Sequence, residues 1–238
     1  MRCTRKIHSG ADSFGSFCIP RSGRKARLRS HPGDIPGRAR RTTRYESCQV
    51  YLAPQPVLSN AVVTWLARES PLSEIARNIL GTNAFPFRAT MFEKSPAANW
   101  LVVWHQDTAL PLQHRQATSG WGPWSVKDGV IYAHAPASTL SQIVALRVHL
   151  DDSTSQNGPL RVLPSTHTLG VLSDDVIHQL AQEIEPVDCT VPRGGIVVMK
   201  PLVIHSSSKS RSNCARRVLH IEYAASTAVA EGLDLAIS

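Results

Sequence analysis

The sequence predicts a mainly β protein, an antiparallel sandwich or barrel with a few helices packed outside it. Two observations predict this fold class. From Phe87 onward, short apolar segments alternate with turn residues, and only one convincing helical pattern interrupts them. The expected strands are Phe87–Glu93, Trp100–Asp107, Val130–His134, Ile143–Leu150, Leu160–Leu163, Ile196–Lys200, Val203–Ser206 and Arg216–Tyr223.

The N-terminal region differs in composition from the rest of the chain. Residues 1–46 hold twelve Lys or Arg and three acidic residues, whereas the whole chain has a net charge of +8. A segment rich in Arg, Ser, Gly and Pro buries too little apolar surface to offset its ordering entropy. We therefore expect a disordered basic segment over residues 1–50 and one folded domain over residues 51–238, with Pro54 and Pro56 marking the linker.

Three interpretations of this basic segment remain open. The segment could have no function, it could be a transit peptide, or it could contact nucleic acid through its charge. Its only aromatic residues are Phe14, Phe17 and Tyr45, which argues against a nucleic-acid partner, since such segments use aromatic side chains to stack on bases. A solvated run of charge is the simplest interpretation.

The rest of the composition indicates a protein of the cytoplasm. No run approaches the roughly 20 apolar residues of a membrane-spanning helix, so no membrane partner is expected. The basic start is not followed by the apolar stretch of a secretory signal. The five cysteines are scattered and contain no C-x-x-C pair, which is typical of a reducing compartment. The oligomeric state cannot be predicted from these features.

Three helices are expected before or among the strands. Residues 57–66 form a first short helix. A second begins after Ser70 as N-cap with Pro71 in the first helical position, and it ends at Gly81. Its apolar residues recur at helical spacing and give it one buried face. A third begins after Ser173 and ends before Pro186.

Two strand positions carry residues that can bind a metal. Residues two apart in a strand point to the same side, so His105 and Asp107 lie side by side while Gln106 points away. A second apolar strand ends at His205. Two imidazoles and one carboxylate are the facial triad of non-haem iron(II) oxygenases, although zinc with an open position accepts the same ligands. The H-x-D motif alone occurs often by chance.

The adjacent residues Arg216 and Arg217 open the last strand. A co-substrate with a free carboxylate needs a fixed cation, and the guanidinium group offers two parallel hydrogen bonds. Strand alternation lets only one of the two face a pocket, and the periodicity does not decide which.

Five motifs in order resemble a known family. They are N-W-x₄-H-Q-D, L-R-x-H-L-D-D, N-G-P-L-R-V-L-P, P-L-x-x-H-x-S-S and R-R-V-L-H, which lie between Asn99 and His220. Together the motifs resemble short bacterial-type members of the phytanoyl-CoA dioxygenase family, and the resemblance covers roughly residues 70–225. It implies a double-stranded β-helix, the jelly-roll or cupin-like core, and a dioxygenase that uses Fe(II), 2-oxoglutarate and O2.

The resemblance also implies roles for individual residues. The iron ligands, which are the catalytic residues, correspond to His105, Asp107 and His205. The co-substrate arginine lies eleven residues beyond the distal histidine and is therefore Arg216. Ser207 and Gln106 are further candidates for co-substrate binding. The implied reaction hydroxylates a C–H bond of a small-molecule substrate and releases succinate and CO2, and the presence of Asp107 argues against halogenation.

Two departures from the family pattern matter. The family often has P-G-S-H where this chain has Pro164-Ser165-Thr166-His167, and serine tolerates a positive φ less readily than glycine. Residues 1–50 also do not resemble the helix and strand with which family members usually begin. The alternative is therefore a catalytically degenerate member that binds metal or ligand without turnover.

Substrate contacts are the least determined feature. Arg147 and His149 share the polar face of one expected strand, which either faces solvent or lines the pocket. Residues 110–128 form a long connection that contains Trp121. Loops of this length are often lids or binding segments, although a tryptophan can equally anchor the loop to the body. All three residues are candidate substrate contacts.

Overall fold

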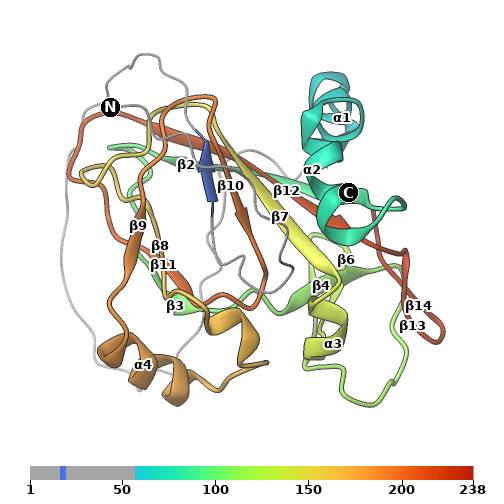
Figure 1. The fold of residues 1–238 in the computed structure, drawn as a ribbon. Helices are drawn as coiled ribbons and strands as arrows, with labels where there is room; N and C mark the ends of the chain where they lie inside the picture. The colour runs from blue at the N-terminus through green and yellow to red at the C-terminus, as the bar shows by residue number, and fades with distance from the viewer. Residues whose placement is uncertain (1–16, 20–56, 238) are drawn as a thin grey trace.

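The computed structural model describes residues 17–19 and 57–237, and the rest of the expected basic segment lies outside these residues. The mainly β fold with antiparallel sheets is confirmed, and two larger sheets form its centre (Figure 1). Residues 17–19 form a strand paired with β10, which differs from the disorder expected there. This tripeptide, Phe17-Cys18-Ile19, contains two residues with high strand propensity.

The larger sheet has five antiparallel strands in the order β1-β10-β7-β12-β2. The long strands β7 and β12 form its centre, and β2 pairs with β12 along its whole length. Its strands are β1 (Phe17–Ile19), β2 (Phe85–Lys94), β7 (Ile143–His149), β10 (Ile196–Met199) and β12 (Arg216–Ala224).

The second sheet has four strands in the order β3-β11-β8-β9. Apolar residues of β7 and β10 pack against those of β8 and β9, so the two sheets face each other across a shared core. The strands are β3 (Val102–His105), β8 (Leu160–Val162), β9 (Val187–Cys189) and β11 (His205–Ser207).

Alternation along β7 and β12 separates a core face from a cavity face. Val144, Leu146, Leu219 and Ile221 point outward and pack under the first two α-helices. The residues between them point inward, toward the second sheet. Polar residues on the inward face are thus buried between the sheets and do not meet bulk solvent; Arg147 is one example, with 7% of its surface exposed.

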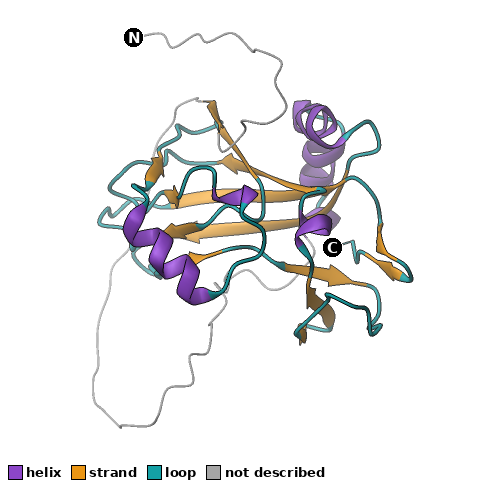
Figure 2. Ribbon diagram, turned by 60° about the horizontal axis from the view of Figure 1, so that its bottom comes forward, coloured by secondary structure: helices purple, strands orange, loops and turns teal. Residues whose placement is uncertain are grey.

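The helices lie on the outside, as expected (Figure 2). The expected first helix is a 3-10 turn, η1 (Val57–Ser59), followed by α1 (Ala61–Arg68). Helix α2 (Pro71–Leu80) has the predicted N-cap, because the Ser70 hydroxyl accepts a bond from the Leu72 N–H at 3.1 Å. Helix α4 (Asp174–Glu183) has Ser173 at its N-cap, but that side chain makes no capping hydrogen bond. It packs outside the second sheet.

The connection over residues 110–128 is more structured than expected. It contains most of β4 (Ala109–Leu112) and β5 (Trp124–Lys127), which pair on either side of β6 (Val130–His134) in a three-stranded sheet. Short strands next to Gly and Pro lack the alternation that sequence analysis relies on. The other elements that were not predicted are α3 (Ala137–Leu140), η2 (Thr166–Thr168), β13 (Ala228–Ala230) and β14 (Leu233–Asp234).

The turn that lacks the family glycine has the backbone that a glycine favours. Ser165 has φ +66°, in the left-handed region, at the start of η2. The serine therefore adopts a left-handed backbone conformation at this turn, although serine favours that conformation less than glycine does.

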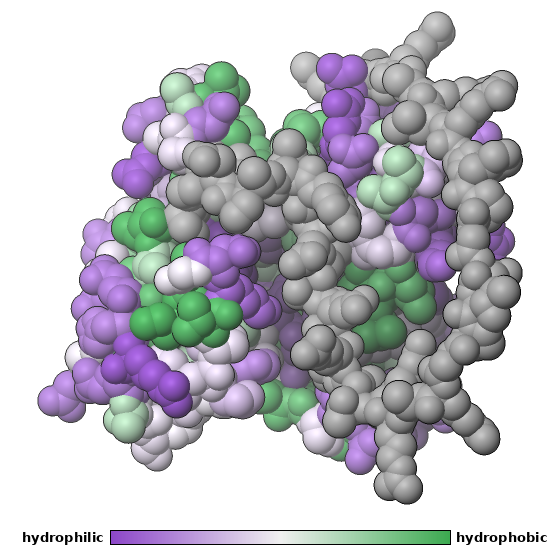
Figure 3. All heavy atoms as spheres, turned by 180° about the vertical axis from the view of Figure 1, so that it is seen from behind, coloured by the Kyte–Doolittle hydropathy of each residue, from purple (hydrophilic) through white to green (hydrophobic). Residues whose placement is uncertain are grey.

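Among the described residues, no helix has the length and apolarity needed to cross a bilayer. Seen from behind, the coloured part of the surface mixes hydrophilic and hydrophobic side chains in small groups (Figure 3).

Candidate metal centre

Paired strands bring the two candidate histidines together. His105 ends β3, His205 begins β11, and the two are register partners across the pair. Their ring centroids lie 4.2 Å apart. Asp107 follows β3, where its backbone N–H donates to the Pro201 carbonyl at 3.0 Å and fixes the chain. One ligand atom from each of the three residues lies within 4.8 Å of the others.

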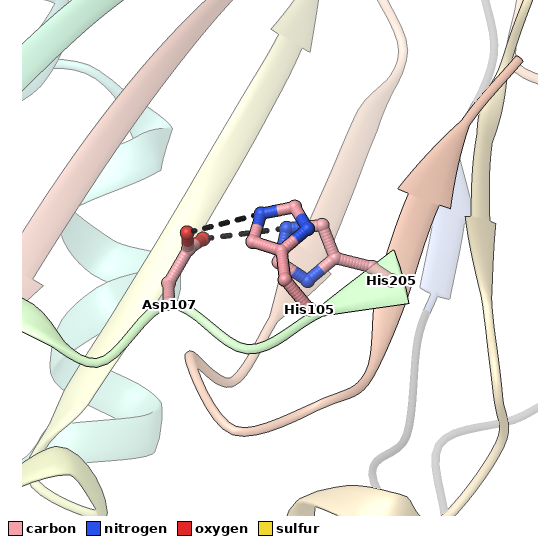
Figure 4. Close-up of side chains that lie close together, drawn as sticks. All are labelled: His105, Asp107 and His205. Atoms are coloured by element: carbon pink, nitrogen blue, oxygen red, sulfur yellow. Dashed lines mark ion pairs between the residues drawn. The ribbon is translucent and has the colours of Figure 1, made fainter. Parts of the chain in front are cut away.

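Both imidazoles are oriented in the way a metal requires. The Nδ1 atoms of His105 and His205 bond the carbonyls of Val103 and Val203 at 2.8 and 2.9 Å. The Nε2 atoms therefore face the Asp107 carboxylate, at 3.6 and 3.5 Å (Figure 4). A backbone acceptor at Nδ1 selects the tautomer whose Nε2 lone pair is available to a metal. Two nitrogens and one carboxylate on one side thus fit a divalent cation with open positions.

The electrostatics of the three residues agree with this arrangement. Burial opposes ionisation of Asp107, but the two imidazoles outweigh it and lower the pKa of the carboxyl. Burial and the neighbouring His105 lower the pKa of His205 to about 4. Burial also acts against the charged form of His105, yet Asp107 raises its pKa. The Asp107 side chain is 39% exposed, and this surface opens into a cavity.

The cavity lies between the two sheets and has a volume of about 730 Å³. The three candidate ligands lie in its wall together with residues of β2, β7 and β12. Its size suits a small ligand together with a small co-substrate.

Two buried cations lie close together at one end of the cavity. Arg216 is 4% exposed, its Nη2 lies 3.5 Å from the Ser207 hydroxyl, and its Nε donates to the Asn157 carbonyl at 3.3 Å. The Lys94 ammonium donates to the same hydroxyl at 2.7 Å. The Lys94 ammonium also bonds the carbonyls of Ser207 and Ser208, so both cations are fixed by the protein, and their charge could attract an anion. Arg217 points to the outer face and pairs with Asp151 at 2.8 Å.

Sequence analysis missed Lys94, which is 1% exposed. The available signal was alternation, because Lys94 shares a face of β2 with Arg88 and Thr90, two other residues of the cavity wall. It also missed Gly158, whose carbonyl accepts a hydrogen bond from the Ser207 hydroxyl at 2.9 Å.

Gln106 lines the cavity and holds the loops around it. Its amide donates to the carbonyls of Gly170 and Leu202, at 2.9 and 2.8 Å, and its oxygen accepts from the Leu172 N–H at 2.9 Å. These bonds use both amide donors to hold two loops against the site. The side chain thus supports the cavity wall, and its expected contact with a co-substrate stays a prediction.

The three candidate substrate residues lie in different places. Arg147 lines the cavity, with its Nη1 3.0 Å from His220 Nδ1 and its guanidinium 5.2 Å from the centre of the Phe92 ring. His149 is 1% exposed and lies deeper, outside the cavity lining. Burial, with Arg147 and Arg216 nearby, lowers its pKa to about 3. Trp121 packs against the apolar core under β4 and β6 and is not part of the cavity wall.

Comparisons with known proteins connect this geometry to a family. The family model for phytanoyl-CoA dioxygenase matches residues 49–218. L-proline trans-4-hydroxylase from Streptomyces griseoviridis is 28% identical over 186 residues, which cover 66% of this chain and 61% of that protein. The chain therefore spans less than two thirds of that relative.

Solved structures share the fold. EctD from S. alaskensis in its apoform gives a TM-score of 0.51 at 19% identity, covering 70% of this chain and 54% of that one. SnoN, a non-haem alpha-ketoglutarate-dependent epimerase from nogalamycin biosynthesis, gives 0.50 at 14% identity, covering 72% and 59%. At these identities, the likeness concerns the architecture.

Proposed function

Because the chain belongs to the phytanoyl-CoA dioxygenase family, we propose that it is an Fe(II)- and 2-oxoglutarate-dependent dioxygenase. Its reaction hydroxylates a C–H bond of a small molecule and releases succinate and CO2. One observation carries the proposal: the facial set His105, Asp107 and His205 shares a cavity with the buried anion site at Arg216.

The chain's own residues have distinct tasks in this proposal. His105, Asp107 and His205 hold iron from one side and leave the cavity side open to ligands. When bound, the metal and its co-substrate supply the oxidising chemistry. Arg216 binds the distal carboxylate of 2-oxoglutarate, and the Lys94 ammonium, whose bonds go to Ser207 and Ser208, adds positive charge beside it. Gln106 keeps the loops at Gly170 and Leu202 in place and so helps to exclude water.

The second candidate is a degenerate member that binds metal or ligand without turnover. The departure of residues 1–50 from the family pattern motivates it. A complete set of candidate ligands and a pair of buried cations in the same cavity speak for the active enzyme.

The test is succinate formation from 2-oxoglutarate with iron(II) supplied anaerobically before oxygen, with and without small candidate substrates. L-proline is the first to try, because a relative acts on it by name. We expect succinate from the wild type and none from His205→Ala, which removes one candidate ligand. Anaerobic titrations of iron and 2-oxoglutarate are run in parallel. Binding of both without succinate under any condition would overturn the enzyme and leave the degenerate member.

A further inference from the structure

The cavity wall contains more basic than acidic side chains. Three acidic residues line it: Asp107, Asp174 and Glu222. Five basic residues line it: Arg88, Lys94, Lys127, Arg147 and Arg216. Under the proposed function, a divalent cation and the two carboxylates of 2-oxoglutarate cancel each other. The excess of positive charge therefore remains, and it favours an anionic substrate.

Arg147 lies apart from the anion site assigned to the co-substrate. It is the register partner of His220, which is four residues along β12 from Arg216. At about 3.3 Å per residue, this places the two arginines roughly 13 Å apart along the sheet. The backbone positions of Arg216 and Arg147 are thus well separated along one wall of the cavity, so each arginine can serve a different anion.

Two further charged residues of the wall, Arg88 and Glu222, form a pair. Both carboxylate oxygens of Glu222 accept from Arg88, one of them at 2.9 Å from Nη2. Burial acts against the charge on Arg88, but Glu222 outweighs it and raises the pKa of the guanidinium. Glu222 is thus committed to Arg88, and this pair adds no net charge to the cavity.

Neighbouring side chains hold the Arg147 guanidinium in position. His220 contacts Nη1 at 3.0 Å, and the Phe92 ring lies beneath the group. A planar guanidinium held in one orientation binds a carboxylate more selectively than a mobile lysine does. A wall with several buried charges is also a poor surface for a long alkyl chain, because the chain would exclude water from them and offer no polar contact.

We infer that Arg147 binds a carboxylate of the substrate, so that the enzyme acts on small carboxylic acids. This inference rests on the proposed function and names the substrate class of the same site. Arg147 is then a specificity-determining residue, and the oxidised C–H bond belongs to a molecule held between Arg147 and the metal centre.

The experiment measures binding and turnover separately. Full-length protein is loaded anaerobically with iron(II) and saturating 2-oxoglutarate and is titrated calorimetrically with small carboxylates. The panel contains free L-amino acids including L-proline, together with short carboxylic acids without an amine. Each is paired with its amide, which keeps the shape and removes the charge. Stimulated succinate formation is then measured for the same panel in oxygen.

We expect at least one carboxylate to bind and its amide to bind at least about tenfold more weakly. In Arg147→Gln, affinity for that carboxylate should fall by about 30-fold or more, because a buried charge loses its partner. Arg147→Lys keeps the charge and should lose less. The control Arg193→Gln makes the same change at an exposed turn and should bind like the wild type.

Three outcomes would overturn the inference. They are equal binding of acid and amide, an Arg147→Gln variant that loses 2-oxoglutarate affinity instead, and a panel in which nothing binds. A fall of 2-oxoglutarate affinity would assign Arg147 to the co-substrate. Carboxylate binding that depends on Arg147 without any succinate would support the carboxylate site and refute the proposed reaction, so the two failures are distinguishable.

Discussion

The substitution Gly158→Ala tests whether the anion site depends on close backbone approach. Gly158 has φ +64°, and an added Cβ would lie less than 3.0 Å from the Ser208 carbonyl oxygen and 3.2 Å from the Lys94 ammonium. The first of these neighbours is backbone and cannot rotate away. Gly129 provides a matched control, because it has φ +80° and its Cβ would meet nothing within 4 Å.

The magnitudes follow from these two environments. A left-handed backbone costs an alanine about 1–2 kcal/mol. Alanine recovers about 0.4–1 kcal/mol by restricting the unfolded chain. Gly129→Ala should therefore lower the free energy of unfolding by about 0.5–1 kcal/mol. Gly158→Ala adds about 1–3 kcal/mol for displaced neighbours and should lose about 1.5–4 kcal/mol in total.

Urea unfolding of both variants measures these losses, and calorimetry measures their affinity for 2-oxoglutarate with the metal bound. The Gly158 variant should also bind 2-oxoglutarate about tenfold more weakly, since a shift of Lys94 that costs about 1.4 kcal/mol changes affinity by that factor. The Gly129 variant should bind it normally. Equal stability losses in the two variants, or unchanged affinity in both, would refute the role given to close approach at Gly158.

Three further substitutions test other features. Ser165→Gly should raise the free energy of unfolding by about 0.5–1 kcal/mol, because it relieves a left-handed serine while enlarging the unfolded ensemble, and a lower urea midpoint would contradict this. His149 has a folded pKa of about 3 against 6.5, so its neutral form stabilises the fold above pH 6.5 and this contribution is lost as the pH falls toward 3. The His149→Leu variant should therefore lose less stability than the wild type between pH 6.5 and 4, by on the order of 3 kcal/mol. Urea midpoints that fall as steeply as in the wild type would contradict this expectation. Arg216→Gln should raise the Kd for 2-oxoglutarate by about 30-fold or more, whereas Arg217→Gln should leave it unchanged, and equal effects in calorimetry would argue against the assignment.

Local patterns predicted the parts of the fold that depend on neighbours in the chain. The N-cap, the glycine at the end and the apolar spacing of α2 predicted its bounds to within one turn, because each of these signals lies in adjacent residues. Strand alternation predicted that His105 and Asp107 lie close together, but β3 ends at His105, and Asp107 is held by its backbone bond to Pro201. Both residues meet His205 only through the pairing of β3 with β11.

Contacts between residues far apart in the chain determine the features that local patterns could not predict. Periodicity could not choose between Arg216 and Arg217, whereas the structure turns the face with Leu219 and Ile221 toward the helices and leaves Arg216 inside. Lys94 joins the anion site through Ser207, which is 113 residues away in the chain. Local sequence patterns cannot predict a contact between residues so far apart in the chain.

The position of the candidate metal ligands has a consequence for the folding of the chain. Strand β3 is the outermost strand of its sheet, and its last residue faces His205 about 100 residues later. A cation held by both histidines would act as a reversible cross-link that closes this long loop. Metal loading should therefore slow amide hydrogen exchange in β3 more than in β7. Metal depletion would instead let β3 detach more readily and expose the edge of β11 to other chains.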